Sequence, residues 1–245
     1  MNSFIIIEYH SIDEVNKAME SLNKDGKRAN DEIIISSNSL YPADKKTAIQ
    51  KESEGKWVFN EKNGGFAYGM NEGLKVAKGE ILIVMNSDVK IISSLEPMID
   101  YLKSHPEVGI IAPKIIDDNG IIQDSFRNFV TPLRFIERQL GRFIYRNKLY
   151  VRKLEKPTKV DWVIGAFMMI RRDFYDKVGG MSEDYFMYCE DMEWCKRTQV
   201  TGYDVVYYPG TVIEYKGTRS ARKHWKYAKI HIKSILTFWK KYGMF

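Results

Sequence analysis

The segment from Asn63 to Val89 constrains the fold more than any other part of this chain, because it joins a glycine-rich turn, a helix and a buried strand in close succession. The helical pattern runs from Phe66 to Ala77, and Gly79 occupies the expected C-cap position. Ile81 to Met85 is then a continuous apolar run, which is typical of a strand covered on both faces. Such a unit predicts an α/β protein with a glycine-rich ligand site.

Two polar residues follow this strand directly. Asn86 and Asp88 are expected at its carboxyl end, the edge at which open α/β sheets bind ligands. Mg²⁺ and Mn²⁺ prefer carboxylate oxygens and commonly bridge them to substrate phosphates, so the pair indicates a metal or diphosphate site. The alternative is a turn whose side chains bond to the local backbone, and this short pattern alone favours that alternative.

Strand and helix patterns alternate through the first half of the chain and predict a mostly parallel sheet. The expected strands cover residues 4–7, 33–35, 56–59, 81–85 and 108–112. The expected helices cover residues 12–22, 43–53, 66–77 and 94–104. Ser11 is placed to cap the first helix, and the polar segment 36–39 is expected to form a turn after the second strand.

The second half is less regular. Helices are expected over residues 132–149, from 172 to Gly179-Gly180, over 190–200 and over 221–241, and strands within 160–170 and at 205–208 and 212–214. No repeat or linker divides the chain. We therefore expect one domain over residues 1–245, with a first half at 1–112, a second at 113–218 and a C-terminal helix within 219–245.

Cysteine content and apolar runs indicate where the protein resides. Cys189 and Cys195 are too few for a disulfide framework and are expected as buried thiols. No signal peptide opens the chain, and no apolar run approaches the length that spans a bilayer. These features predict a protein of the reducing cytoplasm.

The net charge of +6 is concentrated at the end of the chain. After Glu214 there are nine lysines and arginines and no acidic residue, which leaves the rest of the chain near −3. Within this tail an apolar stripe lies beside a basic one; the apolar members are Trp225, Ala228, Ile232, Ile235 and Trp239, and the basic members are Arg222, Lys226, Lys229 and Lys233. The pattern favours a helix docked on the domain. The alternative is peripheral attachment to an anionic membrane at the inner face of the cell. No nucleic-acid-binding module accompanies the charge, so no nucleic-acid partner is expected.

A second cluster of carboxylates lies within residues 185–197. Glu190 and Asp191 begin a predicted helix, where the helix dipole favours negative charge, so a purely structural role explains the pair well. A single positioned carboxylate is also what a general base for a sugar hydroxyl requires. Four nearby aromatic residues would either stack on a sugar or pack in the core; they are Tyr185, Phe186, Tyr188 and Trp194.

Taken in order, these stretches resemble the family 2 glycosyltransferases with a GT-A fold, especially their rhamnosyltransferase-like branch. Residues 63–89 are similar to the donor-site helix and an Asn-x-Asp variant of the DxD motif. Residues 124–132 resemble an arginine-containing segment, and residues 165–197 resemble the acceptor region followed by the ED motif. The resemblance covers the chain from Trp57 to its end.

The resemblance implies a Rossmann-like nucleotide-binding half, residues 1–112, fused to an acceptor-binding and catalytic half. Asp191 would be the catalytic base with support from Glu190, and Asp88 would bind the donor diphosphate through Mg²⁺ or Mn²⁺. The residues implied in donor binding are Ser37, Asn38, Asn63, Gly65, Phe66, Asn71, Asn86, Asp88, Gly165 and Ala166.

Three positions depart from the family pattern. Ser37 replaces an aspartate that reads the nucleotide base in relatives, and Glu8 to His10 replace a Thr-Tyr-Asn-like turn. Tyr215 occupies the place of a histidine that often joins the metal shell. Fixed cations can perform a metal's electrostatic work, so three residues are candidates for neutralising the diphosphate; they are Lys216, Arg219 and Arg222.

The expected function is that of an inverting hexosyltransferase that uses a dTDP- or UDP-sugar, with rhamnose as one candidate sugar. The acceptor would be a saccharide or a lipid-linked oligosaccharide in surface polysaccharide synthesis. A galactosyl- or glucosyltransferase of the same fold is one alternative. The other is a degenerate, non-catalytic protein that binds sugar nucleotide or a partner enzyme, which Ser37 and Tyr215 favour. The presence of Asp88, Glu190 and Asp191 argues against it.

Overall fold

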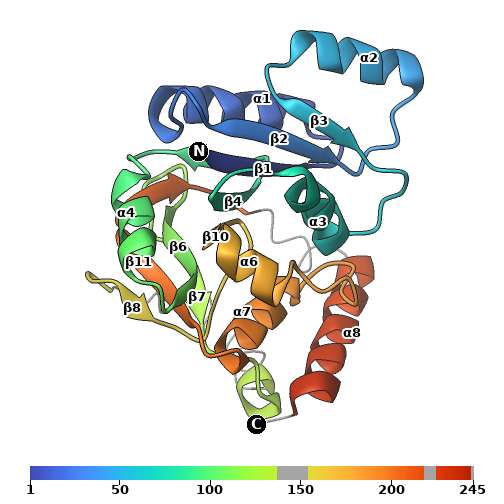
Figure 1. The fold of residues 1–245 in the computed structure, drawn as a ribbon. Helices are drawn as coiled ribbons and strands as arrows, with labels where there is room; N and C mark the ends of the chain where they lie inside the picture. The colour runs from blue at the N-terminus through green and yellow to red at the C-terminus, as the bar shows by residue number, and fades with distance from the viewer. Residues whose placement is uncertain (137–153, 218–224, 244–245) are drawn as a thin grey trace.

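A central mixed sheet organises the molecule in the computed structural model, which describes residues 1–136, 154–217 and 225–243 (Figure 1). In spatial order its strands are β3 (Lys56–Phe59), β2 (Glu32–Ser37), β1 (Asn2–Glu8), β4 (Ile81–Asn86), β10 (Phe167–Arg171), β6 (Val108–Ile116), β11 (Asp204–Glu214) and β5 (Lys90–Ile91). β8 (Thr158–Lys159) pairs with β11, and β7 (Phe126–Arg127) pairs with β9 (Trp162–Val163) in a separate ribbon.

Most of this sheet is parallel, as the alternation of strands and helices predicts. β3, β2, β1 and β4 run parallel to one another, and β11 runs parallel to β6. The exceptions are β10, which lies between β4 and β6 and is antiparallel to both, and the short strands β5 and β8, which are antiparallel to β11. All of β1 is buried, and β4 is buried from Ile81 to Met85, which explains why these strands are continuous apolar runs.

Helices cover both faces of the sheet. One face carries α1 (Ile12–Ser21), the π-helical turn η1 (Leu22–Gly26), α2 (Ala43–Glu52) and α4 (Glu96–Ser104). The other carries α3 (Phe66–Val76), α6 (Arg172–Val178), α7 (Glu190–Val200) and α8 (Trp225–Tyr242). Each face has its own apolar core, so the chain forms one three-layered domain (Figure 1).

Two expected helix caps are wrong. Ser11 occupies the N-cap position of α1, but its side chain makes no capping bond, and its Oγ instead lies 3.0 Å from Oγ of Ser87. α3 ends at Val76, before Gly79. Gly79 packs against β1, where a Cβ would come within 2.5 Å of the backbone nitrogen of Ser3, so close packing accounts for this glycine.

Several expected strand boundaries also change. Residues 205–208 and 212–214 belong to one strand, β11, whose register shifts between Tyr208 and Val212. β6 continues past Ala112 to Ile116, because β11 pairs with it over its whole length. Ser36 and Ser37 are buried residues of β2 rather than of a turn. The helix expected over 132–149 is described only at residues 132–136, and the rest lies outside the described residues.

The final helix is docked on the domain, as expected, and the expected apolar stripe is confirmed in part, since its members Ile235 and Trp239 pack against the core. Ile235 and Phe238 are buried against the domain, together with Ser234, whose Oγ donates a 2.9 Å hydrogen bond to the carbonyl oxygen of Met187. Two members of the expected apolar stripe are not buried, because Trp225 is 71% exposed and Ile232 is 46% exposed.

A buried carboxylate holds the end of α8 against α7. Glu193, on α7, is fully buried and accepts hydrogen bonds from Arg197, from Nζ of Lys241 at 2.9 Å and from the hydroxyl of Tyr242 at 2.8 Å. Burial alone would raise the pKa of Glu193, but these charged and hydroxyl donors lower it overall. Among the described residues, no helix combines the length and apolar character needed to cross a bilayer.

Candidate active site

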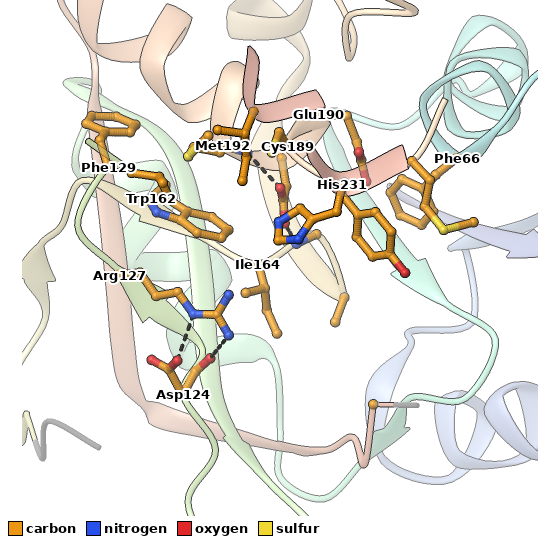
Figure 2. Close-up of a pocket in the computed structure, with 18 of the residues that line it drawn as sticks. Phe66, Asp124, Arg127, Phe129, Trp162, Ile164, Cys189, Glu190, Met192 and His231 are labelled. Carbon is orange, nitrogen blue, oxygen red and sulfur yellow. Dashed lines mark hydrogen bonds and ion pairs between the residues drawn. The ribbon is translucent and has the colours of Figure 1, made fainter. Parts of the chain in front are cut away.

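A cavity of about 890 Å³ opens at the carboxyl edge of the sheet, between the β7–β9 ribbon, the start of α7 and α8. Figure 2 shows Arg127 and Trp162 on one side of it and Phe66 and Glu190 on the other, with His231 between them. Seven of the residues expected to act in catalysis, donor binding or diphosphate neutralisation line it; they are Phe66, Asn86, Gly165, Ala166, Glu190, Asp191 and Lys216. The fold therefore brings the end of β4 and the ED pair into one cavity, although they lie about 100 residues apart in sequence.

Asp191 is held in a fixed orientation by the backbone. Its Oδ2 accepts a 2.9 Å hydrogen bond from the amide of Gly165, and its Oδ1 accepts a 2.8 Å bond from the amide of Met192. Burial raises the pKa of Asp191, while these two amides and the nearby charge of Arg127 act in the opposite direction. A carboxylate with a raised pKa that faces a cavity is suited to accept a proton.

Glu190 has a different environment. The residue is only 6% exposed, and its Oε2 has no hydrogen-bond partner within the described part of the chain. Burial, followed by the negative charge of Asp191, raises the pKa of Glu190 well above its ordinary value. Burial and the neighbouring carboxylate thus both disfavour the charged form of Glu190, whereas two backbone amides and Arg127 favour the charged form of Asp191.

The backbone before α7 is strained. Tyr188 and Cys189 have φ angles of 69° and 68°, in the left-handed region that residues with a side chain seldom adopt. Both residues line the cavity, and the unusual turn places Glu190 and Asp191 at its wall. Strain of this kind persists where surrounding structure enforces it, often at functional sites. Cys189 and Cys195 are buried and unpaired, as expected.

Tight packing joins the start of α3 to this wall. The amide of Phe66 donates a 2.9 Å hydrogen bond to the carbonyl of Phe186. Gly65 has a φ of 94°, and a Cβ there would lie 2.0 Å from the same carbonyl oxygen, so only glycine fits. A Cβ on Gly165 would contact Cβ of Asp191 at 3.2 Å and the ring of Phe66 at 3.4 Å.

The end of β4 has oxygen atoms that suit a divalent cation. Nδ2 of Asn86 donates a 3.1 Å hydrogen bond to the hydroxyl of Tyr215, which leaves Oδ1 of Asn86 buried and without a partner among the residues described. Asp88, two residues on, is exposed and lies outside the residues that line the cavity; desolvation raises its pKa. No cluster of three His, Cys, Asp or Glu side chains suited to a metal occurs in the described ranges. One carboxylate and one amide oxygen fit Mg²⁺ or Mn²⁺ whose other ligands are phosphates and water.

Four expected donor-binding residues have side chains that bond within the protein and do not line this cavity. The Ser37 hydroxyl donates to Glu8, and the Asn38 amide donates to the carbonyl of Gly65 at 2.9 Å. The Asn71 amide donates to the carbonyl of Met181 at 2.8 Å, while Oδ1 of Asn63 accepts from the amide of Gly65 at 3.1 Å. The contacts with Gly65 give Asn38 and Asn63 a role in shaping the glycine-rich turn, whereas Ser37 and Asn71 bond to β1 and to the segment after α6.

The cations expected near the diphosphate are only partly described. Lys216 lines the cavity, and its Nζ forms a 2.5 Å ion pair with Asp118. Arg219 and Arg222 lie outside the described residues. Of the four aromatic candidates, Tyr185 and Trp194 are core residues, Tyr188 lines the cavity and Phe186 is exposed.

The sequence indicated an arginine-containing segment at residues 124–132, but not how its arginine packs in the cavity. Nε of Arg127 forms a 2.7 Å ion pair with Asp124, and its guanidinium lies 5.2 Å from the centre of the Trp162 ring (Figure 2). The three-residue spacing of Asp124 and Arg127 was a signal for this pair, whereas Trp162 and His231 carried no recognisable pattern.

Comparison with known proteins gives consistent matches. The family model described as glycosyl transferase family 2 matches residues 3–179, and one described as the N-terminal domain of galactosyltransferase matches residues 147–221. The chain is 30% identical over 165 residues to N-acetylglucosaminyl-diphospho-decaprenol L-rhamnosyltransferase of Mycobacterium tuberculosis, which covers 64% of this chain and 54% of the relative. It is 27% identical over 213 residues to rhamnosyltransferase WbbL of Escherichia coli K12, which covers 84% of this chain and 79% of that protein. The chain thus spans about half the length of the mycobacterial relative.

Solved structures share the fold. The mannosyltransferase PcManGT of Pyrobaculum calidifontis, in complex with GDP-Man and Mn²⁺, superimposes with a TM-score of 0.67 at 14% identity, covering 98% of this chain and 64% of that one. GalNAc-T7 with UDP, GalNAc and Mn²⁺ gives a TM-score of 0.66 at 18% identity, covering 89% and 44%. The GT-A fold expected from the sequence is confirmed.

Proposed function

Because the chain belongs to glycosyl transferase family 2 and has rhamnosyltransferases among its relatives, we propose that it transfers a sugar from a nucleoside-diphosphate donor with inversion at the anomeric carbon. Rhamnose is the proposed sugar, and dTDP or UDP the proposed nucleotide. The product would be a surface glycan, built on a saccharide or a lipid-linked acceptor.

The position of Asp191 carries this proposal. Both of its oxygens accept backbone amides, yet each carboxylate oxygen has a further lone pair that is available to an acceptor hydroxyl. In the proposed reaction Asp191 removes the hydroxyl proton while the acceptor oxygen bonds to the anomeric carbon. The bond from that carbon to the diphosphate oxygen breaks, and the nucleoside diphosphate leaves with the electron pair.

Asn86 and Asp88 would hold Mg²⁺ or Mn²⁺ at the end of β4 through Oδ1 and the carboxylate. A bound cation there offsets negative charge on the leaving diphosphate. The hydrogen bond from Nδ2 of Asn86 to the Tyr215 hydroxyl fixes the orientation of the Asn86 side chain. Oδ1 of Asn86 therefore points away from Tyr215. Lys216 would add a second positive charge beside the cavity once its exposed pairing with Asp118 is exchanged for a phosphate. Arg219 and Arg222, from the neighbouring segment, are further candidates for the same role.

Calorimetric titration of UDP and dTDP, with and without Mn²⁺, tests the donor site. We expect Mn²⁺-dependent binding of one nucleotide, and we expect Asp88→Ala to abolish that dependence. Asp44→Ala is the matched control, because it removes an exposed carboxylate on α2, outside the cavity. Binding that is indifferent to Mn²⁺ and to Asp88 would support a cation-based site instead. If neither nucleotide binds, the proposal fails and the degenerate, partner-binding alternative replaces it.

We further propose that the exposed edge of α8 attaches the protein to the inner face of an anionic membrane. Trp225, Ile232 and Leu236 are exposed large apolar residues, and the exposed lysines Lys226, Lys229 and Lys233 alternate with them. Such a mixture of apolar and basic side chains suits the headgroup region of a bilayer.

Vesicle sedimentation tests this attachment. Replacing the three lysines by glutamine should release the protein from vesicles that contain phosphatidylglycerol. The same replacement at Lys45, Lys51 and Lys56, which are exposed on α2 and β3, should not. Equal binding of both triple variants would exclude the α8 edge as the site of attachment.

A further inference from the structure

The carboxyl group of Glu190 is buried without a partner that explains its burial. The residue is only 6% exposed and lines the cavity, and no group in residues 1–136, 154–217 and 225–243 bonds to its Oε2. None of the ion pairs within these ranges includes Glu190. Buried polar groups of native proteins are nearly always paired, and each exception calls for an explanation. A ligand in the cavity would supply the missing partner.

The protonation of Glu190 indicates what kind of partner this is. Both oxygens of the adjacent Asp191 accept backbone amides, which favour its charged form. Oε2 of Glu190 receives no such donor, and burial together with the charge of Asp191 raises the pKa of Glu190 well above its ordinary value. A protonated carboxyl group donates a hydrogen bond as well as accepting one. Glu190 therefore suits a neutral ligand group, such as a hydroxyl, better than a cation.

The transferred sugar has to lie between the proposed diphosphate site and the proposed base. The amide of Asn86 donates a 3.0 Å hydrogen bond to the carbonyl of Ala166, and the amide of Gly165 donates a 2.9 Å bond to Oδ2 of Asp191. The two sites thus meet at adjacent residues of the chain. In an inverting displacement the attacking and leaving groups occupy opposite faces of the sugar ring, so the sugar fills the space between the base and the diphosphate.

Glu190 borders this space on one side. Figure 2 shows it on the same side of the cavity as Phe66, with Arg127 on the opposite side. A Cβ at Gly165 would lie 3.4 Å from the ring of Phe66, so the Phe66 side packs closely against the backbone that joins the two sites. An acceptor has the opposite side, toward the β7–β9 ribbon, from which to approach the base. The position of Glu190 therefore favours contact with the transferred sugar over contact with the acceptor.

We propose, building on the proposed glycosyl transfer, that Glu190 is a specificity-determining residue whose protonated carboxyl group donates a hydrogen bond to a hydroxyl oxygen of the transferred sugar. A sugar with a different configuration at that carbon would leave both the hydroxyl and the buried carboxyl group unpaired. Glu190 thus acts on which sugar is bound, whereas Asp191 acts on the acceptor proton.

A purely structural role for Glu190 is the simplest alternative. The residue begins α7, where the helix dipole favours an acidic side chain, and it follows the strained turn at Tyr188 and Cys189. The dipole, however, favours the charged form, which burial beside Asp191 disfavours. A carboxyl group that held the turn in place would also bond to it, yet Oε2 bonds to no described group.

Calorimetry on the full chain with Mn²⁺ tests the proposal. The affinity of dTDP-rhamnose is divided by that of dTDP, and the affinity of UDP-glucose by that of UDP, so each ratio isolates the contribution of the sugar. In the wild type we expect one ratio to be at least tenfold. Glu190→Met should reduce that ratio about tenfold, because a buried sugar hydroxyl loses its partner. Glu190→Gln, whose amide still donates, should keep it within about threefold. The nucleotide alone should bind all three proteins equally, which also reports that the variants fold.

The pH dependence of the same ratio distinguishes donation from acceptance. If the protonated carboxyl group donates, the ratio in the wild type should fall as the pH rises through the raised pKa of Glu190. In Glu190→Gln it should not fall. Other titratable groups on the same segment or elsewhere on the cavity wall are Asp191, Cys189, Arg127, Tyr215, Lys216 and His231. They are present in both proteins, so the difference between the two profiles belongs to Glu190.

Glu20→Met is the matched control, because Glu20 is an exposed carboxylate on α1, outside the cavity, and its replacement should change nothing. Four results would overturn the inference. One is a wild type in which neither sugar adds affinity. Another is an equal loss of nucleotide and sugar-nucleotide affinity in Glu190→Met, which would assign a structural role. The others are an unchanged ratio in that variant and a wild-type ratio that rises with pH. Each can occur while the wild type binds the nucleotide with Mn²⁺, so the failure of this inference and that of the proposed function are distinguishable.

Discussion

The amide of Gly165 donates a 2.9 Å hydrogen bond to Oδ2 of Asp191, across 26 residues of sequence. Gly165 precedes β10, and the amide of Asn86 at the end of β4 donates a 3.0 Å bond to the carbonyl of the adjacent Ala166. The proposed base and the proposed diphosphate site are therefore linked through two consecutive residues, so their separation is set by the backbone.

Replacing the proposed base should remove transfer while keeping donor binding. Asp191→Asn preserves the size of the side chain but cannot accept the acceptor proton, so kcat should fall by about 10²–10⁴-fold, the usual contribution of a general base. Nucleotide affinity by calorimetry should stay within a few-fold. Asp173→Asn, at an exposed carboxylate on α6, is the control. Transfer at the wild-type rate in Asp191→Asn would remove Asp191 from the mechanism.

A methyl group at Gly165 should displace Asp191. The added Cβ would lie 3.2 Å from Cβ of Asp191 and 3.4 Å from the Phe66 ring, which is closer than most such contacts. We expect Gly165→Ala to fold and to lose about tenfold or more in kcat, because small errors in the placement of a catalytic group are costly.

Making room for the new methyl group on the Phe66 side tests whether displacement of Asp191 causes the loss of activity. Phe66→Leu, added to Gly165→Ala, should restore part of the activity by letting the new methyl group move away from Asp191. A double variant no more active than Gly165→Ala would show that displacement is not the cause.

The pH dependence of kcat should report the environment of Asp191. The base must be ionised to accept a proton, and burial raises its pKa, so activity should fall as the pH drops through this raised value. The positive charge of Arg127 acts to lower the same pKa. Arg127→Gln should therefore move the acidic limb to higher pH, measured at saturating substrate. An acidic limb at the same pH in both proteins would contradict this coupling.

The buried Glu193 should stabilise the docked α8. Removing one partner of a buried charged network typically costs about 3–5 kcal/mol, so Glu193→Gln should lower the free energy of unfolding in urea by about 3 kcal/mol at pH 7. Glu72→Gln, which breaks an exposed pair with Lys75, should change it by less than about 1 kcal/mol.

The same network predicts the sign of the pH effect on stability. The folded-state pKa of Glu193 is lowered relative to the unfolded state, in which it is about 4.3. The contribution of Glu193 to stability is therefore present above the unfolded-state pKa and is lost as the pH falls through the folded-state pKa. The difference in stability between wild type and Glu193→Gln should therefore shrink below pH 4. If the difference in stability stays constant over that range, the stabilisation by Glu193 does not depend on its charge.

Much of the fold was predictable because its signals are local. The apolar run at Ile81–Met85, the helix from Phe66 and the glycines that end α6 each follow from neighbouring residues. The cap expected at Gly79 was wrong because that glycine serves a contact with Ser3 in a different strand. The break expected in β11 was wrong because pairing with β6 carries the strand through an irregular register.

The candidate site was predictable only in part. Asp191 and Asn86 lie in recognisable patterns, and the structure places both at one cavity. The packing of Arg127 over the Trp162 ring depends on the pairing of β7 with β9, which no sequence spacing reveals. The buried face of α8 was predicted only in part for a similar reason. Ser234 is polar but buried, because its hydroxyl donates a hydrogen bond to the carbonyl of Met187, a contact between distant parts of the chain.

The antiparallel strand β10 determines how the two halves of the chain can move. Because it pairs with β4 on one side and β6 on the other, strands from both halves of the chain share one continuous ladder of hydrogen bonds. A rigid-body hinge between the halves would have to break that ladder. Motion that keeps the ladder intact is therefore confined to elements at the rim of the sheet, and the spacing between the end of β4 and the start of β10 is fixed by the sheet itself.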